Sequence, residues 1–184
     1  MDHKWLVIGG AGYIGSHINE ILSANQIQTY VLDNLSTGYE RRIQDHQNFV
    51  NFDASDSDML SDLVREKGIT KIVHLAARRQ ARDSFDQAMD YWSNNLKTTL
   101  SVANVASQFR IEEIIYSSSC SVYGNESEIK EDSLLAPISP YGRTKMVGEQ
   151  ILEDVLRNTD TKLSILRYFN VIGASTNLPL FDST

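Results

Sequence analysis

The chain has 184 residues, of which 41% are hydrophobic and 22% charged, a balance typical of a globular domain with a continuous core. Its formal net charge of −7 disfavours nucleic acid as a partner, because phosphate binding usually requires a basic face. The single cysteine, Cys120, excludes an intramolecular disulfide, and no apolar run has the length of a membrane span or a signal peptide. These features predict a cytoplasmic protein of one domain without a membrane partner.

Short apolar runs alternate with longer segments of helical periodicity along the chain. We expect strands at Trp5–Ile8, Thr29–Leu32, Asn48–Phe52, Lys71–Leu75, Glu113–Ser117 and Lys162–Leu166. We expect helices at about Tyr13–Asn25, Asp56–Lys67, Gln87–Phe109 and Tyr141–Arg157. Most of the strands are rich in Val, Ile and Leu, as is typical of parallel strands covered on both faces. The alternation of strand and helix predicts an α/β fold with a doubly wound parallel sheet.

Two stretches lack a clear periodicity, Ser36–Gln47 and Gly124–Pro140. Loops of this length in a compact domain are often functional. Both follow the carboxyl ends of expected strands, which is where ligands bind in open α/β sheets. We therefore expect the binding site at this edge of the sheet.

The first expected strand leads into a glycine-rich turn, Gly9-Gly10-Ala11-Gly12-Tyr13-Ile14-Gly15, which opens the first expected helix. Glycines at this spacing permit a tight turn and a close approach of the backbone to a pyrophosphate. The N-terminus of the helix that follows favours the charge of the phosphate. For this motif alone, the alternative is a tight turn without a ligand.

Asp33 ends the second expected strand, where a dinucleotide site has its acidic residue. A carboxylate at this place accepts both ribose hydroxyls of NAD and repels the 2′-phosphate of NADP. The alternative is an aspartate that closes a turn before Asn34. Together, the glycine turn and Asp33 predict an NAD-binding Rossmann fold.

A tyrosine and a lysine, Tyr141 and Lys145, lie one turn apart on one face of the last expected helix. An ammonium group, joined by a positively charged nicotinamide, lowers the pKa of a nearby tyrosine and makes it an acid–base group. Taken alone, the pair is more typical of a solvated surface. Upstream, the serines of Ser117–Ser121 run off the end of a strand and can donate to a substrate oxygen. A serine-rich turn is the alternative, and nothing local decides which serine faces the site.

The combined motifs resemble those of the extended short-chain dehydrogenases, and among them the UDP-glucose 4-epimerases (UDP-galactose 4-epimerases). The resemblance extends in family order from about residue 5 to about residue 174. The matching stretches are residues 9–17, Asp33-Asn34-Leu35, His74-Leu75-Ala76-Ala77, Asn94-Asn95, Ser117–Gly124, Pro140–Lys145 and Leu166-Arg167-Tyr168-Phe169-Asn170.

The resemblance implies a catalytic set of Ser119, Tyr141 and Lys145, and no metal. It places Asp53 at the adenine end of NAD, and Arg79 where these epimerases commonly have a lysine beside the nicotinamide. It places Asn170 at the diphosphate or sugar of the substrate, beside Ser119 and Tyr141; a cap of a strand–loop junction is the alternative for Asn170. The implied NAD contacts are Gly9, Gly12, Tyr13, Ile14, Gly15, Asp33, Asn34, Asp53, Ala54, Leu75, Ala76, Ala77, Arg79, Asn95, Ser117, Tyr141, Lys145 and Tyr168.

The reaction that the resemblance implies is the 4-epimerisation of a UDP-hexose, UDP-glucose or UDP-galactose, with NAD as a transient oxidant. Tyr141 would take the proton of the sugar 4-hydroxyl while hydride passes from C4 to NAD. Ser119 would hydrogen-bond the same oxygen, and Lys145 would hold the nicotinamide ribose. The 4-keto sugar would then turn over and receive the hydride on its opposite face. NAD would stay tightly bound, because no net redox change occurs.

The sequence departs from the family pattern at two places. Arg82 stands where the epimerases tend to have glycine, and it would change or block the substrate, pair with its diphosphate, or lie in a solvated turn with a salt bridge. Family members also continue past residue 184 into a smaller domain that closes over the nucleotide sugar. We therefore expect a cofactor domain at 1–174, a tail at 175–184, and a substrate domain that is largely absent.

Two other functions remain as alternatives. Another nucleotide-sugar enzyme of the family, a dehydratase or decarboxylase, is disfavoured because Cys120 and Ser121 stand where a dehydratase has acidic residues. A catalytically silent, truncated NAD-binding module is the other alternative.

The resemblance also implies a homodimer, in which the helices Gln87–Phe109 and Tyr141–Arg157 form a four-helix bundle. The alternative is that the apolar faces of these helices only cover the sheet.

Overall fold

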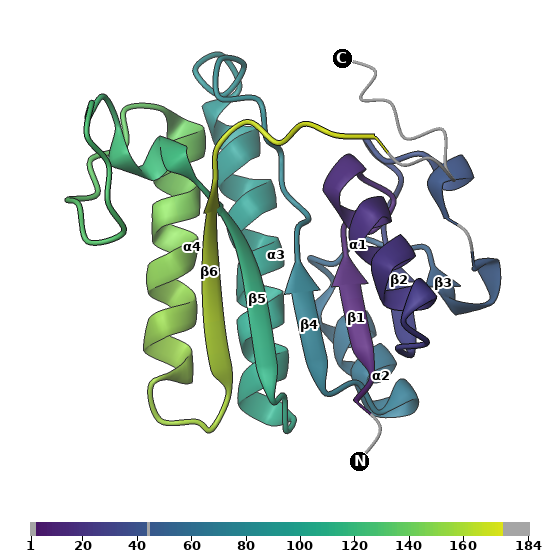
Figure 1. The fold of residues 1–184 in the computed structure, drawn as a ribbon. Coiled ribbons are helices and arrows are strands. Elements are labelled where there is room, and N and C mark those ends of the chain that lie inside the picture. The colour runs from purple at the N-terminus through teal and green to yellow at the C-terminus, as the bar shows by residue number, and fades with distance from the viewer. Residues whose placement is uncertain (1–2, 44, 175–184) are drawn as a thin grey trace.

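The computed structural model describes residues 3–43 and 45–174, which form one sheet with helices on both faces (Figure 1). Six parallel strands lie in the order β3-β2-β1-β4-β5-β6. The strands are β1 (Trp5–Ile8), β2 (Thr29–Leu32), β3 (Phe49–Val50), β4 (Lys71–His74), β5 (Glu113–Ser119) and β6 (Lys162–Tyr168). The α-helices are α1 (Tyr13–Ala24), α2 (Ser57–Lys67), α3 (Ala88–Gln108) and α4 (Pro140–Leu156). The tail expected at 175–184 lies outside the described residues.

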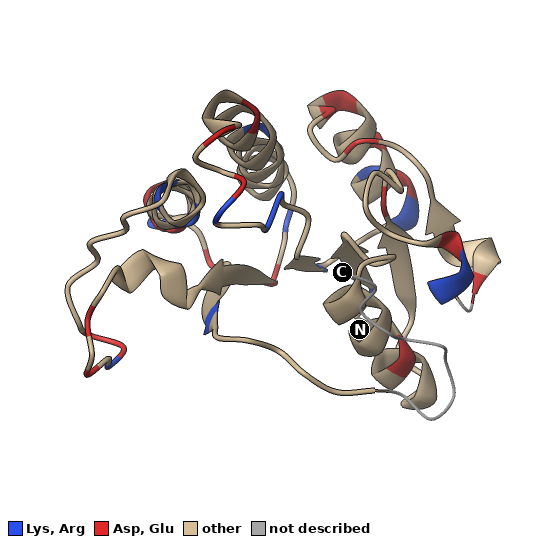
Figure 2. Ribbon diagram, turned by 90° about the horizontal axis from the view of Figure 1, so that it is seen from above, with Lys and Arg blue, Asp and Glu red and all other residues tan. Residues whose placement is uncertain are grey.

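The order of the strands reverses between β1 and β4. From β1 the chain moves outward through β2 to β3, returns through α2 to β4, and then moves outward through β5 to β6. Two perpendicular views place α1 on one face of the sheet and α2, α3 and α4 on the other (Figure 1, Figure 2). The predicted doubly wound parallel sheet is thus confirmed, and ligands of such sheets bind at the carboxyl ends of the strands beside this reversal.

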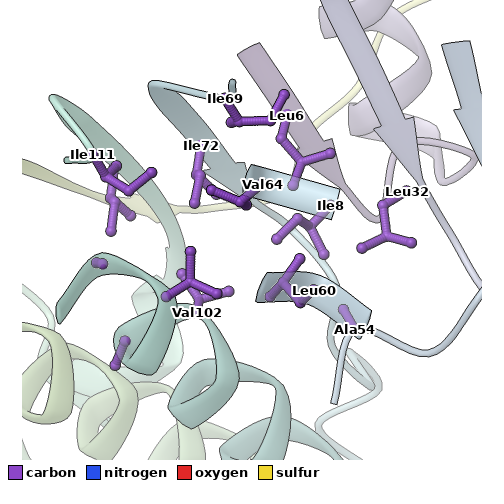
Figure 3. Close-up of a cluster of buried hydrophobic side chains, with 14 of the residues drawn as sticks. Leu6, Ile8, Leu32, Ala54, Leu60, Val64, Ile69, Ile72, Val102 and Ile111 are labelled. Atoms are coloured by element: carbon purple, nitrogen blue, oxygen red, sulfur yellow. The ribbon is translucent and has the colours of Figure 1, made fainter. Parts of the chain in front are cut away.

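Apolar side chains fill the space between the sheet and the helices α2 and α3 (Figure 3). The cluster includes Leu6, Ile8, Leu32 and Ile72 from the strands, Leu60 and Val64 from α2, and Val102 from α3. Successive side chains of a strand point to opposite faces, so Val7 points away from this cluster, and it is also fully buried. Both faces of the central strand β1 are therefore covered, as its continuous apolar run predicts. None of the described helices has the length and apolarity needed to span a membrane.

Local signals set the ends of the helices on which the site depends. Ser139 caps α4, because its side chain accepts a hydrogen bond from the Gly142 amide, and Pro140 occupies the first turn, where its missing amide costs nothing. Asp56 caps α2 in the same way, and Gly68 ends that helix with a φ of +64°. These caps place Tyr141 in the first turn of α4, at the carboxyl edge of the sheet.

Several predicted boundaries are wrong by a few residues. The third strand is only Phe49–Val50, because Asp45 accepts the amide of Gln47 and starts a short 3-10 helix over His46–Asn48. A second 3-10 helix, Glu40–Arg42, lies in the stretch that has no periodicity, and a third, Cys120–Tyr123, follows β5. The strands β5 and β6 extend two residues beyond the prediction and pair as far as Ser119 and Tyr168. The residues added at these two ends pair in the sheet, although they do not form the apolar run that predicts a strand.

Candidate active site

The glycine turn between β1 and α1 has a shape that side chains would not fit. Gly9 has a φ of +83°, and a Cβ atom added to it would lie 2.7 Å from the Ala76 nitrogen. A Cβ atom on Gly15 would lie 2.6 Å from the Cα atom of Gly10, so this glycine lets α1 pack directly on the turn. No side chain caps α1, and its first turn has no acidic residue, as far as the described residues show. The positive end of the helix dipole is therefore available to an anion.

Asp33 fixes the glycine turn to the end of β2. Its Oδ2 atom accepts the Ala11 amide at 2.9 Å, and its Oδ1 atom accepts the Leu35 amide at 2.8 Å. Burial raises the pKa of Asp33 above its ordinary value, and these two hydrogen bonds oppose that rise. The second bond closes a turn in which Leu35 has a φ of +58°. Asp33, the predicted ribose acceptor, thus lies beside the glycine turn, and it also makes the turn that was the alternative interpretation.

Asn34 and Asp53 lie beside Asp33, at the ends of β2 and β3. The Asn34 side chain donates to Asp53 Oδ2 at 2.9 Å, and the Ser55 amide donates to Asp53 Oδ1 at 2.9 Å. Burial alone would raise the pKa of Asp53, but the hydrogen bonds from Ser55 and Asn34 contribute to a net pKa below the ordinary value. Ala54, the next residue after Asp53, is buried. Asp53, which is expected at the adenine end of NAD, thus forms a polar corner with Asn34.

The loop after β4 is held against the glycine turn and against α3. The amides of Leu75 and Ala76 both donate to the Ile8 carbonyl, at 2.9 and 3.1 Å. Asn95 of α3 accepts the Arg78 amide at 2.8 Å, and it donates to the Arg78 carbonyl and to Thr144 Oγ1. The polar atoms of Asn95 therefore join this loop to α4, in addition to any contact with a cofactor.

Ser119, Tyr141 and Lys145 come together at the carboxyl ends of β5 and the start of α4. Their exposed fractions are 7%, 9% and 3%. The Ser119 side chain lies close enough to Tyr141 to lower the pKa of its phenol, and the Lys145 ammonium donates to the Ser117 carbonyl at 2.7 Å. The neighbouring Ser118 instead donates to Glu149. The question that the sequence leaves open, which serine faces the tyrosine, is thus answered in favour of Ser119.

A lowered pKa, which we predict for Tyr141 beside Lys145 and a positively charged nicotinamide, is not found for the chain alone. Burial raises the pKa of Tyr141, while the Ser119 side chain and the charge of Arg79 lower it in part. Burial also lowers the pKa of Lys145 to about 8, against the attraction of Glu149. The physical reason is that the lysine donates to the Ser117 carbonyl, so desolvation outweighs any effect of its charge on Tyr141.

The remaining expected residues lie around this centre with different degrees of burial. Arg78 points to the start of α3, where it donates to Gln87 at 2.8 Å, whereas Arg79 is close enough to Tyr141 to act on it electrostatically. Arg82 and Asn170 are exposed. Tyr168 is partly buried and pairs in register with Ser119. The residues after β6 pass to the α1 side of the sheet, where Tyr13 donates to the Gly173 carbonyl (Figure 1, Figure 2).

Two buried polar residues, Ser84 and Glu149, and the partly buried Arg167 lie beside the catalytic set and were not predicted. Ser84 is fully buried and accepts the Tyr141 amide at 3.1 Å, and Glu149 and Arg167 form an ion pair at 2.7 Å behind Ser118. The available signal for Glu149 was its position on α4, one turn beyond Lys145, among residues that face the sheet. No pattern in the sequence distinguishes Ser84 from an ordinary turn serine.

Comparison with known proteins agrees with this geometry. The model of the NAD dependent epimerase/dehydratase family matches residues 5–183. The UDP-glucose 4-epimerase of Lactobacillus helveticus is 36% identical over 176 residues, which are 95% of this chain and 53% of that protein. A putative UDP-glucose 4-epimerase of Methanocaldococcus jannaschii is 36% identical over 171 residues, which are 91% of this chain and 56% of that protein.

Solved structures show the same similarity. The UDP-glucose 4-epimerase of Brucella ovis, in complex with NAD, is 34% identical with a TM-score of 0.89, over 95% of this chain and 54% of that one. The enzyme of Bifidobacterium longum, in complex with NAD+ and UDP, is 30% identical with a TM-score of 0.87, over 95% and 55%. The chain thus spans about half the length of these relatives. It belongs to the NAD dependent epimerase/dehydratase family.

Proposed function

We infer that the chain is the cofactor-binding and catalytic part of a UDP-glucose 4-epimerase, which interconverts UDP-glucose and UDP-galactose. The observation that carries this proposal is the contact of Ser119 with Tyr141, with the buried Lys145 one turn along α4. A phenol beside a serine hydroxyl, with a buried ammonium one helical turn away, is an arrangement that suits the transfer of one proton from a sugar hydroxyl. The names of the relatives, UDP-glucose 4-epimerases, support the same substrate.

The residues present fit NAD as the cofactor. The turn at Gly9 and Gly15 leaves no room for a Cβ atom but lets a pyrophosphate approach the backbone, and Asp33 faces the end of β2, where a ribose would bind. We assign the cofactor contacts to the set expected from the sequence: Gly9, Gly12, Tyr13, Ile14, Gly15, Asp33, Asn34, Asp53, Ala54, Leu75, Ala76, Ala77, Arg79, Asn95, Ser117, Tyr141, Lys145 and Tyr168. When bound, NAD supplies a reversible acceptor of hydride for C4 of the sugar.

In the proposed mechanism, Tyr141 takes the proton of the 4-hydroxyl and returns it after the sugar has turned. Ser119 hydrogen-bonds the same sugar oxygen and holds it within reach of Tyr141. Lys145 stays beside the phenol because its ammonium is fixed on the Ser117 carbonyl. A positively charged group near the tyrosine lowers its pKa toward the neutral range, against the effect of burial. Asn170 is the residue that we assign to the diphosphate or sugar of the substrate, and Arg79 is the one that we assign to the nicotinamide side of the cofactor.

The observations disfavour the alternative functions. Cys120 follows Ser119 directly and is the first residue of a 3-10 helix, so no carboxylate stands where a dehydratase has its acid. Ser119, Tyr141 and Lys145 are all present and close together, which disfavours a silent NAD-binding module.

A homodimer through α3 and α4 is part of the proposal. Apolar side chains remain exposed on these two helices: Met89 at 80%, Leu100 at 51% and Val155 at 39%. Apolar residues that project away from the sheet are typical of a protein interface. Two copies of α3 and α4 that pack on these residues would form the expected four-helix bundle.

Turnover is tested by mixing the purified chain with NAD and UDP-galactose and following UDP-glucose by NMR. We expect UDP-glucose to form, and Tyr141→Phe to slow its formation by about 100-fold or more, the usual contribution of an acid–base group. Tyr39→Phe, at an exposed tyrosine outside the catalytic set, is the matched control. A chain that binds NAD but forms no UDP-glucose would contradict the epimerase and favour the silent module. A 4-keto-6-deoxy product would favour the dehydratase.

A further inference from the structure

Glu149 is a buried acid that the proposed reaction does not use. It lies on α4, one turn after Lys145 and two turns after Tyr141, with 2% of its surface exposed. A carboxylate at this depth is costly unless charged partners and hydrogen bonds compensate for the lost water. Its partners therefore show what the fold requires at this position.

The partners of Glu149 come from both strands that end beneath the catalytic set. Ser118 of β5 donates to Glu149 Oε1. Arg167 of β6 donates to both oxygens, from Nε to Oε1 at 3.1 Å and from Nη2 to Oε2 at 2.7 Å. This two-pronged geometry fixes the arginine in direction as well as distance. One carboxylate thus fastens the ends of β5 and β6 to α4.

Arg167 extends these contacts to the loop after β5. Its Nη1 atom donates to the Tyr123 hydroxyl at 2.8 Å and to the Glu131 carbonyl at 2.9 Å, and its guanidinium lies 5.1 Å from the centre of the Tyr123 ring. Tyr123 ends the short 3-10 helix that begins directly after Ser119. Glu149 and Arg167 therefore hold residues on both sides of Ser119 in the chain, Ser118 before it and Tyr123 after it.

The bonding places Glu149 directly behind the two groups that act. Ser118 stands between Ser117, whose carbonyl accepts the Lys145 ammonium, and Ser119, which lies close to Tyr141. A change at Ser118 would move both neighbours, because the strand backbone is continuous. We propose that Glu149, acting with Arg167, is a positioning residue that holds Ser119 and Lys145 in place beside Tyr141. This proposal rests on the proposed function only for its kinetic consequence.

Lys145 has several ionisable or aromatic neighbours, and among the described residues the acidic one that acts on it is Glu149. The ammonium lies 5.1 Å from the centre of the Tyr116 ring. It is also close enough to His74 for its charge to disfavour protonation of that ring. Burial lowers the pKa of His74 to about 3, so that ring is neutral. Burial raises the pKa of Tyr116, so that phenol is neutral as well. Glu149 is thus the acidic residue that raises the pKa of Lys145 against the effect of burial.

The test follows the titration of Lys145 by NMR, in protein with carbon-13 at the lysine Cε atoms and with the signal assigned from Lys145→Arg. This readout needs no ligand, so it stays informative if the chain shows no turnover. We expect a midpoint near pH 8 in the unmodified chain, and a midpoint at least about one pH unit lower in Glu149→Gln. Glu153→Gln, one turn further along α4 at an exposed position, should leave the midpoint unchanged.

A second variant separates positioning from folding. Glu149→Gln leaves the partly buried Arg167 without its anion, and such a loss can prevent folding. Glu149→Gln/Arg167→Gln removes both charges, and we expect it to fold with a midpoint still below that of the unmodified chain. Where the unmodified chain turns over, Glu149→Gln should lower kcat more than it raises KM. A folded variant with an unchanged Lys145 midpoint would overturn the proposal, even if its melting temperature fell.

Discussion

At the scale of single residues, Asp33 combines a structural contact with a proposed contact to the cofactor. Its two oxygens accept the amides of Ala11 and Leu35, so it joins the glycine turn to the end of β2. Each oxygen of an ionised carboxylate has more than one lone pair, so both can accept ribose hydroxyls as well. The turn aspartate and the ribose acceptor are therefore the same residue.

We expect Asp33→Asn to weaken the binding of NADH by about 10- to 100-fold, because hydrogen bonds to a charged group contribute about 1.5–3 kcal/mol. The amide also has one oxygen for the two backbone donors. A fluorescence titration with NADH measures the change. Asp45→Asn is the matched control, because Asp45 accepts the amide two residues on in the same way but starts a different turn. Equal losses in the two variants would contradict the assignment.

His74 shows how a buried residue of the site couples to pH. It is 1% exposed, its Nε2 atom contacts Thr99 Oγ1 at 3.2 Å, and burial, with the charge of Lys145, lowers its pKa from 6.5 to about 3. Between these two pH values the unfolded chain binds a proton that the folded chain does not. The free energy of unfolding therefore falls as the pH decreases through this range.

The expected loss from His74 is about 3 kcal/mol between pH 7 and pH 4, since one pKa unit corresponds to about 1.4 kcal/mol. Urea denaturation of the unmodified chain and of His74→Gln at the two pH values measures it. The variant should lose less stability on acidification. His46→Gln, at an exposed histidine, should behave like the unmodified chain. The same acid loss in His74→Gln and in the unmodified chain would show that His74 does not cause it.

At the scale of elements, α4 packs on β5 through a glycine. A Cβ atom on Gly148 would lie 2.9 Å from the Tyr116 Cζ atom, and Tyr116 is almost fully buried. The helix therefore approaches the strand at the turn between Lys145 and Glu149. Because this contact sets the distance between α4 and β5, it contributes to the place of Tyr141 above Ser119.

Gly148→Ala should lower the free energy of unfolding by about 1–3 kcal/mol, the usual effect of overpacking a core. In an exposed helix the same change would stabilise by up to about 1 kcal/mol. The sign of the change in the free energy of unfolding therefore shows whether Gly148 is packed against Tyr116. Tyr116→Phe removes the atom nearest to the new methyl group, and the loss should be smaller in that background. Urea unfolding measures all four chains, with Gln150→Ala as the surface control. A stabilised Gly148→Ala would contradict the packing described here.

The elements themselves were largely predictable from the sequence. Apolar runs such as Trp5–Ile8 and Lys71–His74 are strands because both faces of a parallel sheet are buried, and the period of the residues between them is helical. The ends of β5 and β6 were not predictable. Ser118, Ser119 and Arg167 are polar, and they lie in strands because their partners, among them Glu149, come from a distant helix.

The candidate site was predictable to a similar extent. The glycine turn with Asp33, and Tyr141 with Lys145, lie in local patterns, and the family resemblance selected Ser119 from the serine run. Ser84 and Glu149 act on residues far away in the chain, on the Tyr141 amide and on Ser118. Only the folded structure brings such pairs together, so their roles have no local signal.

At the scale of the whole molecule, the proposed dimer predicts different effects for substitutions at two exposed apolar residues. Leu100 lies on α3 and is 51% exposed, whereas Ile21 lies on α1, on the other face of the sheet, and is 62% exposed. Leu100→Glu should convert the dimer into a monomer, because it places charges in an apolar interface. Ile21→Glu should leave the dimer intact. Light scattering at high protein concentration decides, and a monomeric unmodified chain would contradict the bundle.

The central claim is that this chain binds NAD at the glycine turn between β1 and α1, beside the end of β2. Calorimetric titration of the folded chain with NAD and with NADP tests it most directly. We predict that the chain binds NAD saturably. We predict that it binds NADP about 10-fold or more weakly than NAD, because Asp33 repels the 2′-phosphate. A folded chain that shows no saturable binding of NAD would contradict the claim.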